Sequence, residues 1–250
     1  MNVSELATPI PFRWQINGKL CVFAFCFLPL LVSLGGWQIA RAQQKLTLSQ
    51  TIATEQAKPA VDFADYKNTV NPEGFSYRAV TLTGRFIAEH YWLIENKTFN
   101  GQTGFEVVMP VQADTGDIVL VNRGWLKGSG DRQHLPMITT PAGVVQLQGW
   151  LTTPSHNRLL TGAVSNAGWP KLILQLNFAQ QEQELGRTLW PQVLQLQEQS
   201  MAALTTHWQP INMPAAKHYG YAVQWFAMAL ALAILTFIAN SNFVQWMKQK

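Results

Sequence analysis

Two long apolar runs without charged residues stand near the two ends of the chain. The first covers positions 20–40 and the second positions 218–247. A helix rises about 1.5 Å per residue and a bilayer core is about 30 Å thick, so each run is long enough to span one. The pattern predicts transmembrane helices at 20–40 and 218–240, and the first helix is expected to continue to Ala57.

Each run also has another interpretation. The first could be a cleaved signal peptide, because Arg13 and Lys19 precede it and Ala40-Arg41-Ala42 loosely resembles a cleavage site. The run is longer than the ~7–15 residues of a signal-peptide core, and Arg is unfavourable at the centre of such a site. The second could be a buried helix of a soluble domain, but Trp225 and Trp246 lie near its ends, as in the aromatic belts of membrane proteins. Two spans are therefore the better interpretation.

Between the two runs, short segments alternate hydrophobic and polar residues, which is the pattern of strands buried on one face. Asp114–Asp117 is a turn sequence between the third and fourth segments, as in a hairpin. A domain with so many short strands favours a closed antiparallel sheet, because closure removes exposed edges. The predicted strands are Tyr77–Phe86, His90–Asn96, Gly104–Gln112, Asp117–Leu126, Val144–Leu151, Lys171–Leu176, Gln192–Leu196 and His207–Ile211.

One short helix and one linker are expected within this region. Phe178–Leu185 can form a helix with Asn177 as N-cap, Gln180 three residues later and Gly186 at its end. Lys58–Gly74 contains prolines and is expected to be a linker. The predicted fold is a membrane protein in which two transmembrane helices flank a mainly antiparallel, barrel-like α+β domain outside the cytoplasm.

The formal net charge of +4 comes largely from the tails. Residues 41–217 contain 14 Lys and Arg against 13 Asp and Glu, whereas tails 1–19 and 241–250 contain four basic residues against Glu5 alone. An excess of basic residues in short tails beside a span marks the cytoplasmic side, although Arg41 and Lys45 follow the first span on its other side. Both tails are therefore predicted to be cytoplasmic and the central domain periplasmic, in a bacterial inner membrane. A domain this close to neutrality also argues against a nucleic-acid partner.

Candidate catalytic chemistry is sparse. The sequence contains no G-x-S-x-G, H-E-x-x-H, P-loop or G-x-G-x-x-G motif, and its five histidines are too widely spaced for a local zinc motif. Both cysteines, Cys21 and Cys26, lie in the first apolar run, so the central domain has no thiol chemistry. An enzyme is therefore the least favoured class of function.

Three segments resemble motifs of one protein family. Leu34–Arg41 reads LGGWQIAR, Leu120–Trp125 reads LVNRGW, and Lys217–Phe226 reads KHYGYAVQWF. In order and position they are similar to the end of the first span, a signature strand and the opening of the second span in the surfeit locus protein one family, known in yeast as the Shy-type factors. The resemblance covers nearly the whole chain.

This resemblance implies a function in the assembly of haem-copper cytochrome c oxidase, without catalysis. Such a factor is expected to bind haem a and to assist its insertion into cytochrome c oxidase subunit I, with haem A synthase as a further partner and the lipid bilayer around its helices. The family's candidate iron ligand is the His at the start of the second span, here His218. The chain departs from the family at Ala216, where Asn is frequent. The alternative in another class is a haem-free scaffold that holds nascent oxidase subunits together.

The residues around His218 can also be interpreted without the family. On a helix, His218, Tyr221 or Ala222, and Trp225 share one face, so an imidazole would lie above an aromatic, apolar stripe that suits a flat porphyrin. His218 could equally be an interfacial residue that contacts headgroups, with Tyr221 and Trp225 as anchors in the aromatic belt.

The first span offers further candidates. Gly35 and Gly36 would let the two helices approach closely and would bring Trp37 towards His218. Arg41 could pair with haem propionates, or it could snorkel to lipid phosphates.

Arg123, Gly124 and Trp125 form a separate candidate motif at the end of a predicted strand. Arg123 would point either to solvent or to a buried carboxylate, and Gly124 would turn the strand. A structural role is favoured over recognition of a partner.

Overall fold

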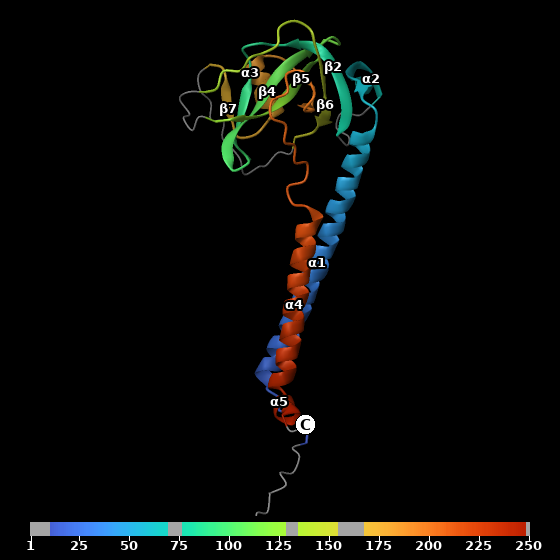
Figure 1. The fold of residues 1–250 in the computed structure, drawn as a ribbon, viewed down its shortest axis with the longest axis vertical. Helices are drawn as coiled ribbons and strands as arrows, with labels where there is room; N and C mark the ends of the chain where they lie inside the picture. Colours follow the sequence, from blue (N-terminus) through green and yellow to red (C-terminus); the bar gives the residue numbers. More distant parts are fainter. Residues whose placement is uncertain (1–10, 70–76, 129–134, 155–167, 249–250) are drawn as a thin grey trace, which may run out of the picture. The chain divides into compact units, whose positions relative to one another are not determined.

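The structure is a computed structural model that describes residues 11–69, 77–128, 135–154 and 168–248. Its contacts divide the chain into two units (Figure 1). The helical unit contains the residues up to Ser49 and from Ile211 onward, and the barrel unit is Gln50–Pro210. His134 and His156, two of the five histidines, lie outside the described residues.

Two long helices form most of the helical unit. α1 is Gly18–Ala57, α4 is Ala215–Ala239, and the short α5, Phe243–Met247, follows α4. Both α1 and α4 are long and apolar enough to cross a membrane. The prediction that the first helix continues to Ala57 is confirmed, and the second begins at Ala215, directly after Pro214.

α1 and α4 pack antiparallel along a seam that repeats every seven residues. Gln38 and His218 are hydrogen-bonded near one end of this seam, and Cys21 and Asn240 near the other. Steps of three and four residues alternate along each helix, which is the spacing of two helices that wind around each other. The buried or half-buried seam residues are Ala24, Leu28, Leu31, Gly35, Gln38 and Ala42 in α1, and His218, Ala222, Trp225, Ala229, Leu232 and Thr236 in α4.

The barrel unit contains one eight-stranded sheet that closes on itself. β2 pairs with β6, β6 with β8, β8 with β5 and β5 with β4, and β4 returns to β2, so five strands form a ring. Most pairings are antiparallel; β1–β2, β3–β7 and β5–β8 are parallel. The predicted barrel-like, mainly antiparallel fold is therefore confirmed. The strands are β1 Val61–Asp62, β2 Arg78–Phe86, β3 Trp92–Phe99, β4 Gln102–Ala113, β5 Ile118–Lys127, β6 Val145–Thr152, β7 Lys171–Ile173 and β8 Val193–Leu196.

Alternating side chains of these strands fill the barrel. In β6, Leu147 and Leu151 are fully buried, whereas Gln146 and Gln148 are exposed. A second apolar cluster, which includes the fully buried Trp92, packs with α3, Phe178–Leu185. The barrel unit thus has the water-excluding interior of an ordinary soluble domain.

Two predictions about the connecting segments are wrong. The expected linker Lys58–Gly74 contains β1 and α2, Phe63–Thr69, because Phe63 and Tyr66 are only 1% and 2% exposed and pack into the barrel core. Residues 207–211 form no strand. Just before this segment, Thr205 forms a single isolated antiparallel bridge with Trp125.

The helix α3 has the predicted bounds but a different cap. The side chain of Asn177 makes no capping hydrogen bond; instead the backbone N–H of Asn177 donates to Oε1 of Gln181, at 2.7 Å. Gln181, one position beyond the predicted Gln180, is the residue that reaches back over the first turn. Gly186 ends the helix, as predicted, and the structure shows it in the left-handed conformation.

Candidate functional site

His218 lies in the first turn of α4 and faces α1. Its side chain is buried, with 8% of its surface exposed. One ring nitrogen, Nδ1, lies 2.8 Å from Oε1 of Gln38. The other, Nε2, is buried and has no hydrogen-bond partner among the residues that the structure describes.

This arrangement selects one tautomer of the imidazole. With Oε1 of Gln38 assigned as the acceptor, Nδ1 is the donor, and a neutral imidazole then has its lone pair on Nε2. Metal-binding histidines commonly donate their second ring N–H to a carbonyl or carboxylate, which holds the ring in place. Gln38 therefore holds one ring nitrogen of His218, and the unpaired Nε2 is the atom that could bind a metal.

The residues around His218 pack closely. Ala222, one turn along α4, is buried, and Trp225 is half-buried in the same seam. A Cβ atom added to Gly35 would lie 2.7 Å from Cζ of Phe226, so a larger residue there would collide with that ring. Nε2 of His218 is covered in this packing. Porphyrin binding would therefore require the imidazole to turn or the helices to part.

The other predicted site residues of the helical unit lie outside the seam. Trp37 and Tyr221 are 51% and 43% exposed, and Arg41 is exposed as well. The Arg41 guanidinium carbon lies 5.7 Å from the centre of the Trp37 ring, and its Nη1 donates to Gln44 at 3.1 Å. A role for these three residues in haem binding stays a prediction.

Sequence reasoning missed Gln38, the residue that contacts His218. It had directed attention to Gly35, Gly36 and Trp37; Gly35 does contact α4, whereas a Cβ on Gly36 would meet open space. The missed signal is the seven-residue spacing from Leu31 through Gly35 to Gln38, which places a polar amide on the packed face of an apolar helix.

The second candidate, the NRGW segment (Asn122–Trp125), contains a β-bulge. Val108 of β4 is opposite Asn122, and Val107 is opposite Gly124, so Arg123 is the extra residue. A bulge redirects the side chain of its extra residue. Here the consequence is that Arg123 turns inward and is only 4% exposed.

Arg123 is held by backbone carbonyls rather than by a carboxylate. Its Nε donates to the oxygen of Ala202 at 2.7 Å, and its Nη1 donates to the oxygen of Thr139 at 3.1 Å. The guanidinium also lies 5.6 Å from the ring centre of Phe86. Among the described residues it forms no ion pair, so the expectation of solvent or a buried carboxylate is wrong for this part of the chain. Burial lowers the pKa of Arg123 from its ordinary value.

Gly124 and Trp125 hold the chain that leads towards α4. Gly124 has a φ of +117°, and a Cβ there would lie 2.6 Å from the oxygen of Thr205. The N–H of Trp125 donates to that oxygen at 2.7 Å, and the N–H of Leu204 donates to the oxygen of Arg123 at 2.7 Å. These contacts support the structural role of the motif: the NRGW segment clamps residues 202–205 to β5.

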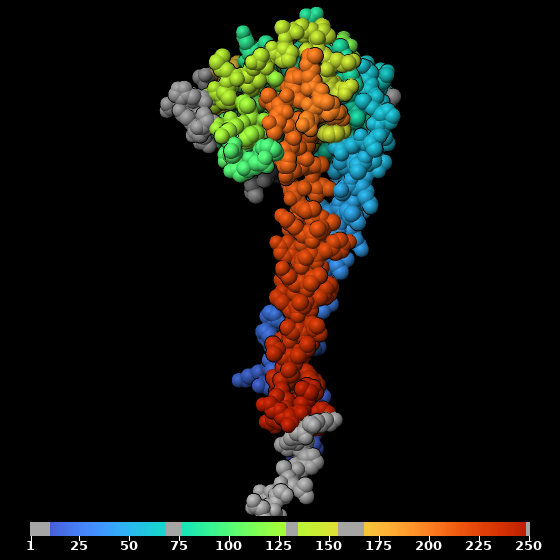
Figure 2. Space-filling model, in the orientation of Figure 1, coloured from blue at the N-terminus to red at the C-terminus, as the bar shows by residue number. Residues whose placement is uncertain are grey.

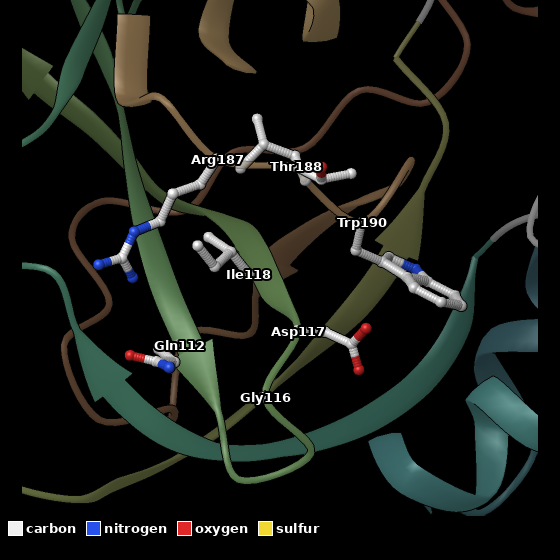
Figure 3. A pocket seen from close by; sticks show the side chains of 8 residues that line it. Gln112, Gly116, Asp117, Ile118, Arg187, Thr188 and Trp190 are labelled. Carbon is white, nitrogen blue, oxygen red and sulfur yellow. The ribbon is translucent and has the colours of Figure 1, made fainter. Parts of the chain in front are cut away.

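A pocket of about 570 Å³ opens at the turn between β4 and β5 (Figure 3). Arg187 and Gln112 line one side, and Asp117 and Trp190 line the other. The carboxylate of Asp117 is already engaged, because Lys67 and Thr115 donate to it at 2.6 and 2.7 Å. Within the described residues, no group of three or more His, Cys, Asp or Glu side chains could hold a metal ion. The pocket therefore offers no recognisable catalytic arrangement.

Comparison with known proteins identifies the family. The model of the SURF1 family matches residues 25–230. A SURF1-like protein of Rickettsia felis is 23% identical over 229 residues, which cover 86% of this chain and 94% of that protein. The cytochrome oxidase assembly protein SHY1 of Saccharomyces cerevisiae is 28% identical over 135 residues, which cover 52% of this chain and 35% of that protein. The resemblance inferred from the three motifs is thus confirmed: the chain belongs to the SURF1 family.

Proposed function

We propose that this chain is a membrane-anchored, non-catalytic factor for cytochrome oxidase assembly that binds haem a and assists its insertion into subunit I. Membership of the SURF1 family supports the general role, since the similar yeast protein carries the name of an oxidase assembly protein. One observation supports the haem-binding step: Nε2 of His218 is buried and has no partner among the described residues, while Gln38 holds Nδ1.

Several residues of the helical unit would each contact a different part of haem a, which the protein carries as cargo. His218 would offer Nε2 to the haem iron, and Gln38, beside Nδ1, would fix the direction of the ring. Trp225 and the small Ala222 give an apolar wall on the same seam. Tyr221, Trp37 and Arg41, at the rim of the helix pair, would receive the polar edge of the porphyrin, with Arg41 paired to a propionate.

The same proposal places the chain in a bacterial inner membrane, with the barrel unit in the periplasm. The basic tails support this orientation. Haem A synthase is the partner that would supply the cargo, and subunit I would receive it. A reporter inserted at Gly116 should be active only as a periplasmic fusion, and cytoplasmic activity at that position would overturn the orientation.

A haem-free scaffold is the second candidate, and one observation favours it. Nε2 of His218 is covered, and Gly35 is in close contact with the ring of Phe226, so the helix pair is already closed. A scaffold would use this stable pair to hold the barrel unit at the membrane beside nascent oxidase subunits, without any cofactor.

Absorption spectroscopy separates the two candidates. The full chain, produced together with haem A synthesis, should copurify with haem a. His218→Ala should lose most of the haem or shift its spectrum, because the axial ligand is gone. Gln38→Leu should bind haem more weakly, by about ten-fold, because a residue that hydrogen-bonds to a metal ligand typically changes metal affinity ten- to hundred-fold.

His90→Ala is the matched control, because His90 belongs to the barrel unit, where its Nδ1 lies 3.2 Å from the oxygen of Ala88. Its haem content and spectrum should equal those of the wild type. If His218→Ala binds haem a with unchanged affinity and spectrum, the ligand assignment fails. A wild-type chain that copurifies without haem would favour the scaffold.

A further inference from the structure

The pocket at the turn between β4 and β5 has a positive charge that the described residues do not neutralise. Arg187 and Gln112 line one side of this pocket (Figure 3), and both side chains are exposed, as the barrel surface in Figure 2 illustrates for the unit as a whole. Arg187 forms no ion pair within the described residues. The carboxylate on the other side, Asp117, already accepts hydrogen bonds from Lys67 and Thr115. The described lining residues therefore present one free guanidinium and no free carboxylate.

A second arginine lies beside Gln112 on the neighbouring strand. Arg85 of β2 is directly opposite Gln112 of β4, and Gln112 is directly opposite Ile118 of β5. Residues directly opposite in an antiparallel pair share one face of the sheet, with their Cβ atoms about 5 Å apart. Arg85 is exposed and also forms no ion pair in the part of the chain that the structure describes. The amide of Gln112 thus has one unpaired arginine beside it on β2 and another, Arg187, in the same pocket.

The acidic residues of the adjoining helix α3 have other partners. Glu182 accepts a hydrogen bond from the N–H of Leu189 at 2.8 Å, and Glu184 accepts one from Nε1 of Trp92 at 2.6 Å. Asp114, in the turn between β4 and β5, forms no ion pair with either arginine. Arginine keeps its charge throughout the physiological pH range, so the two guanidinium groups favour an anion supplied from outside the described chain.

We propose that Arg85, Gln112 and Arg187 bind an acidic segment of a partner protein. A guanidinium group has a planar fork of donors that matches a carboxylate, and the amide of Gln112 adds a further donor. The cavity of about 570 Å³ is in the size range of pockets that bind whole small molecules, which is more than a lone phosphate ion needs. The half-buried Trp190 gives an apolar wall for a residue next to the acidic one.

This site goes beyond the proposed haem-binding function. Arg85, Gln112 and Arg187 all belong to the barrel unit, whereas His218 and Gln38 belong to the helical unit. The inference adds recognition of a protein segment to the general role in oxidase assembly, and it does not depend on whether the chain binds haem.

Calorimetric titration with a short peptide tests the proposal on the full chain in an uncharged maltoside detergent. The probe is acetyl-Asp-Glu-Phe-Asp-amide, which combines carboxylates with one aromatic residue, and its neutral counterpart is acetyl-Asn-Gln-Phe-Asn-amide. The acidic peptide should bind, and its affinity should fall as the salt concentration rises, because charge attraction at an exposed site is screened. The neutral peptide should show no measurable binding.

Charge-removing variants locate the site. Arg187→Gln and Arg85→Gln should each weaken binding of the acidic peptide by about ten-fold, because each removes hydrogen bonds between charged groups. Lys127→Gln is the matched control, since it removes the same charge at the other end of β5, about 30 Å along the strand from Ile118. Its affinity should equal that of the wild type.

Several results would overturn the proposal. They include absence of binding by the acidic peptide, equal binding of the two peptides, and wild-type affinity in both arginine variants. Inorganic phosphate that displaces the peptide at a similar concentration would replace the proposal with a phosphate site, and phosphatidylglycerol that does so in mixed micelles would replace it with a lipid-headgroup site. The haem spectrum of Arg187→Gln should equal that of the wild type, which separates this test from that of His218.

Discussion

The barrel unit and the helical unit bury opposite kinds of side chain. In the barrel, Leu82 and Leu120 are fully buried. In the helices, Phe25 and Val223 are 80% and 68% exposed, while the buried seam residues are small or polar: Ala24, Gly35, Ala42, His218, Ala222 and Ala229. The barrel excludes water from an apolar interior, which is the main source of its stability. The helices have the reverse pattern because lipid is as apolar as their side chains, so only close packing and hydrogen bonds hold them together.

The largest effect is expected from truncation of a large core residue in the barrel. Trp92→Ala should lower the free energy of unfolding by about 3–5 kcal/mol, because it leaves a cavity and removes the hydrogen bond from Nε1 to Glu184. Phe25→Ala, an equally drastic change of an exposed helix residue, should leave barrel unfolding unchanged. Thermal unfolding of the full chain in detergent, followed by near-ultraviolet dichroism, measures both. Equal losses would mean that the two units do not differ as described.

The clamp formed by the NRGW segment should give the next effect. Gly124→Ala would place a Cβ on a residue with positive φ and push it against the oxygen of Thr205. The free energy of unfolding should fall by about 2–3 kcal/mol. Gly116→Ala has a φ of +87° but meets no atom, so it should cost about 1 kcal/mol, from backbone strain alone. Chemical unfolding of both variants gives the difference, and similar losses would argue against the collision with residue 205.

The helix pair should respond to bulk rather than to hydrophobicity. Gly35→Ala should push the helices apart and destabilise their contact by about 1 kcal/mol, because its Cβ meets the ring of Phe226, whereas Gly36→Ala meets open space. The readout is the rate of disulfide formation in a Gln38→Cys, His218→Cys background. The rate should fall several-fold when Gly35→Ala is added to this background, and it should stay unchanged when Gly36→Ala is added. Equal rates for both glycine variants would contradict the packing.

The smallest effect concerns the ion pair between Lys67 and Asp117 on the surface of the barrel. Burial opposes ionisation of Asp117, but hydrogen bonds from Lys67 and Thr115 and the charge of Lys67 outweigh it and lower the pKa of Asp117. A lowered pKa in the folded state adds stability at neutral pH, and this is lost as the pH falls below the ordinary carboxylate range towards the folded pKa. Because the side chains are 37% and 24% exposed, the contribution should be below about 1 kcal/mol.

Unfolding measured between neutral and acidic pH tests this contribution. Asp117→Asn should be slightly less stable than the wild type at neutral pH, and the difference should shrink in acid. A difference that does not depend on pH would show that the carboxylate contributes through shape alone.

Local patterns in the sequence were sufficient to place most elements. Uncharged runs located α1 and α4, and alternation located seven of the eight strands within a few residues, because both signals depend on neighbours in the chain. β1 and α2 were missed because the flanking Pro59 and Pro72 and the polar residues between them resemble a linker, whereas Phe63 and Tyr66 are held by distant strands. The motifs at residues 34–41, 120–125 and 217–226 indicated the family, which the comparison confirmed.

Only the tertiary structure decided which of these residues meet. The order of the ring, in which β8 separates β5 from β6 and β4 returns to β2, depends on pairings between residues far apart in sequence. The inward turn of Arg123 follows from a bulge that no local pattern marks. The contact of His218 with Gln38, rather than with Trp37, depends on how α1 is rotated against α4. The sequence determined which faces are apolar, because polarity is a property of each residue, whereas partners across a seam or a barrel are set by the packing of whole elements.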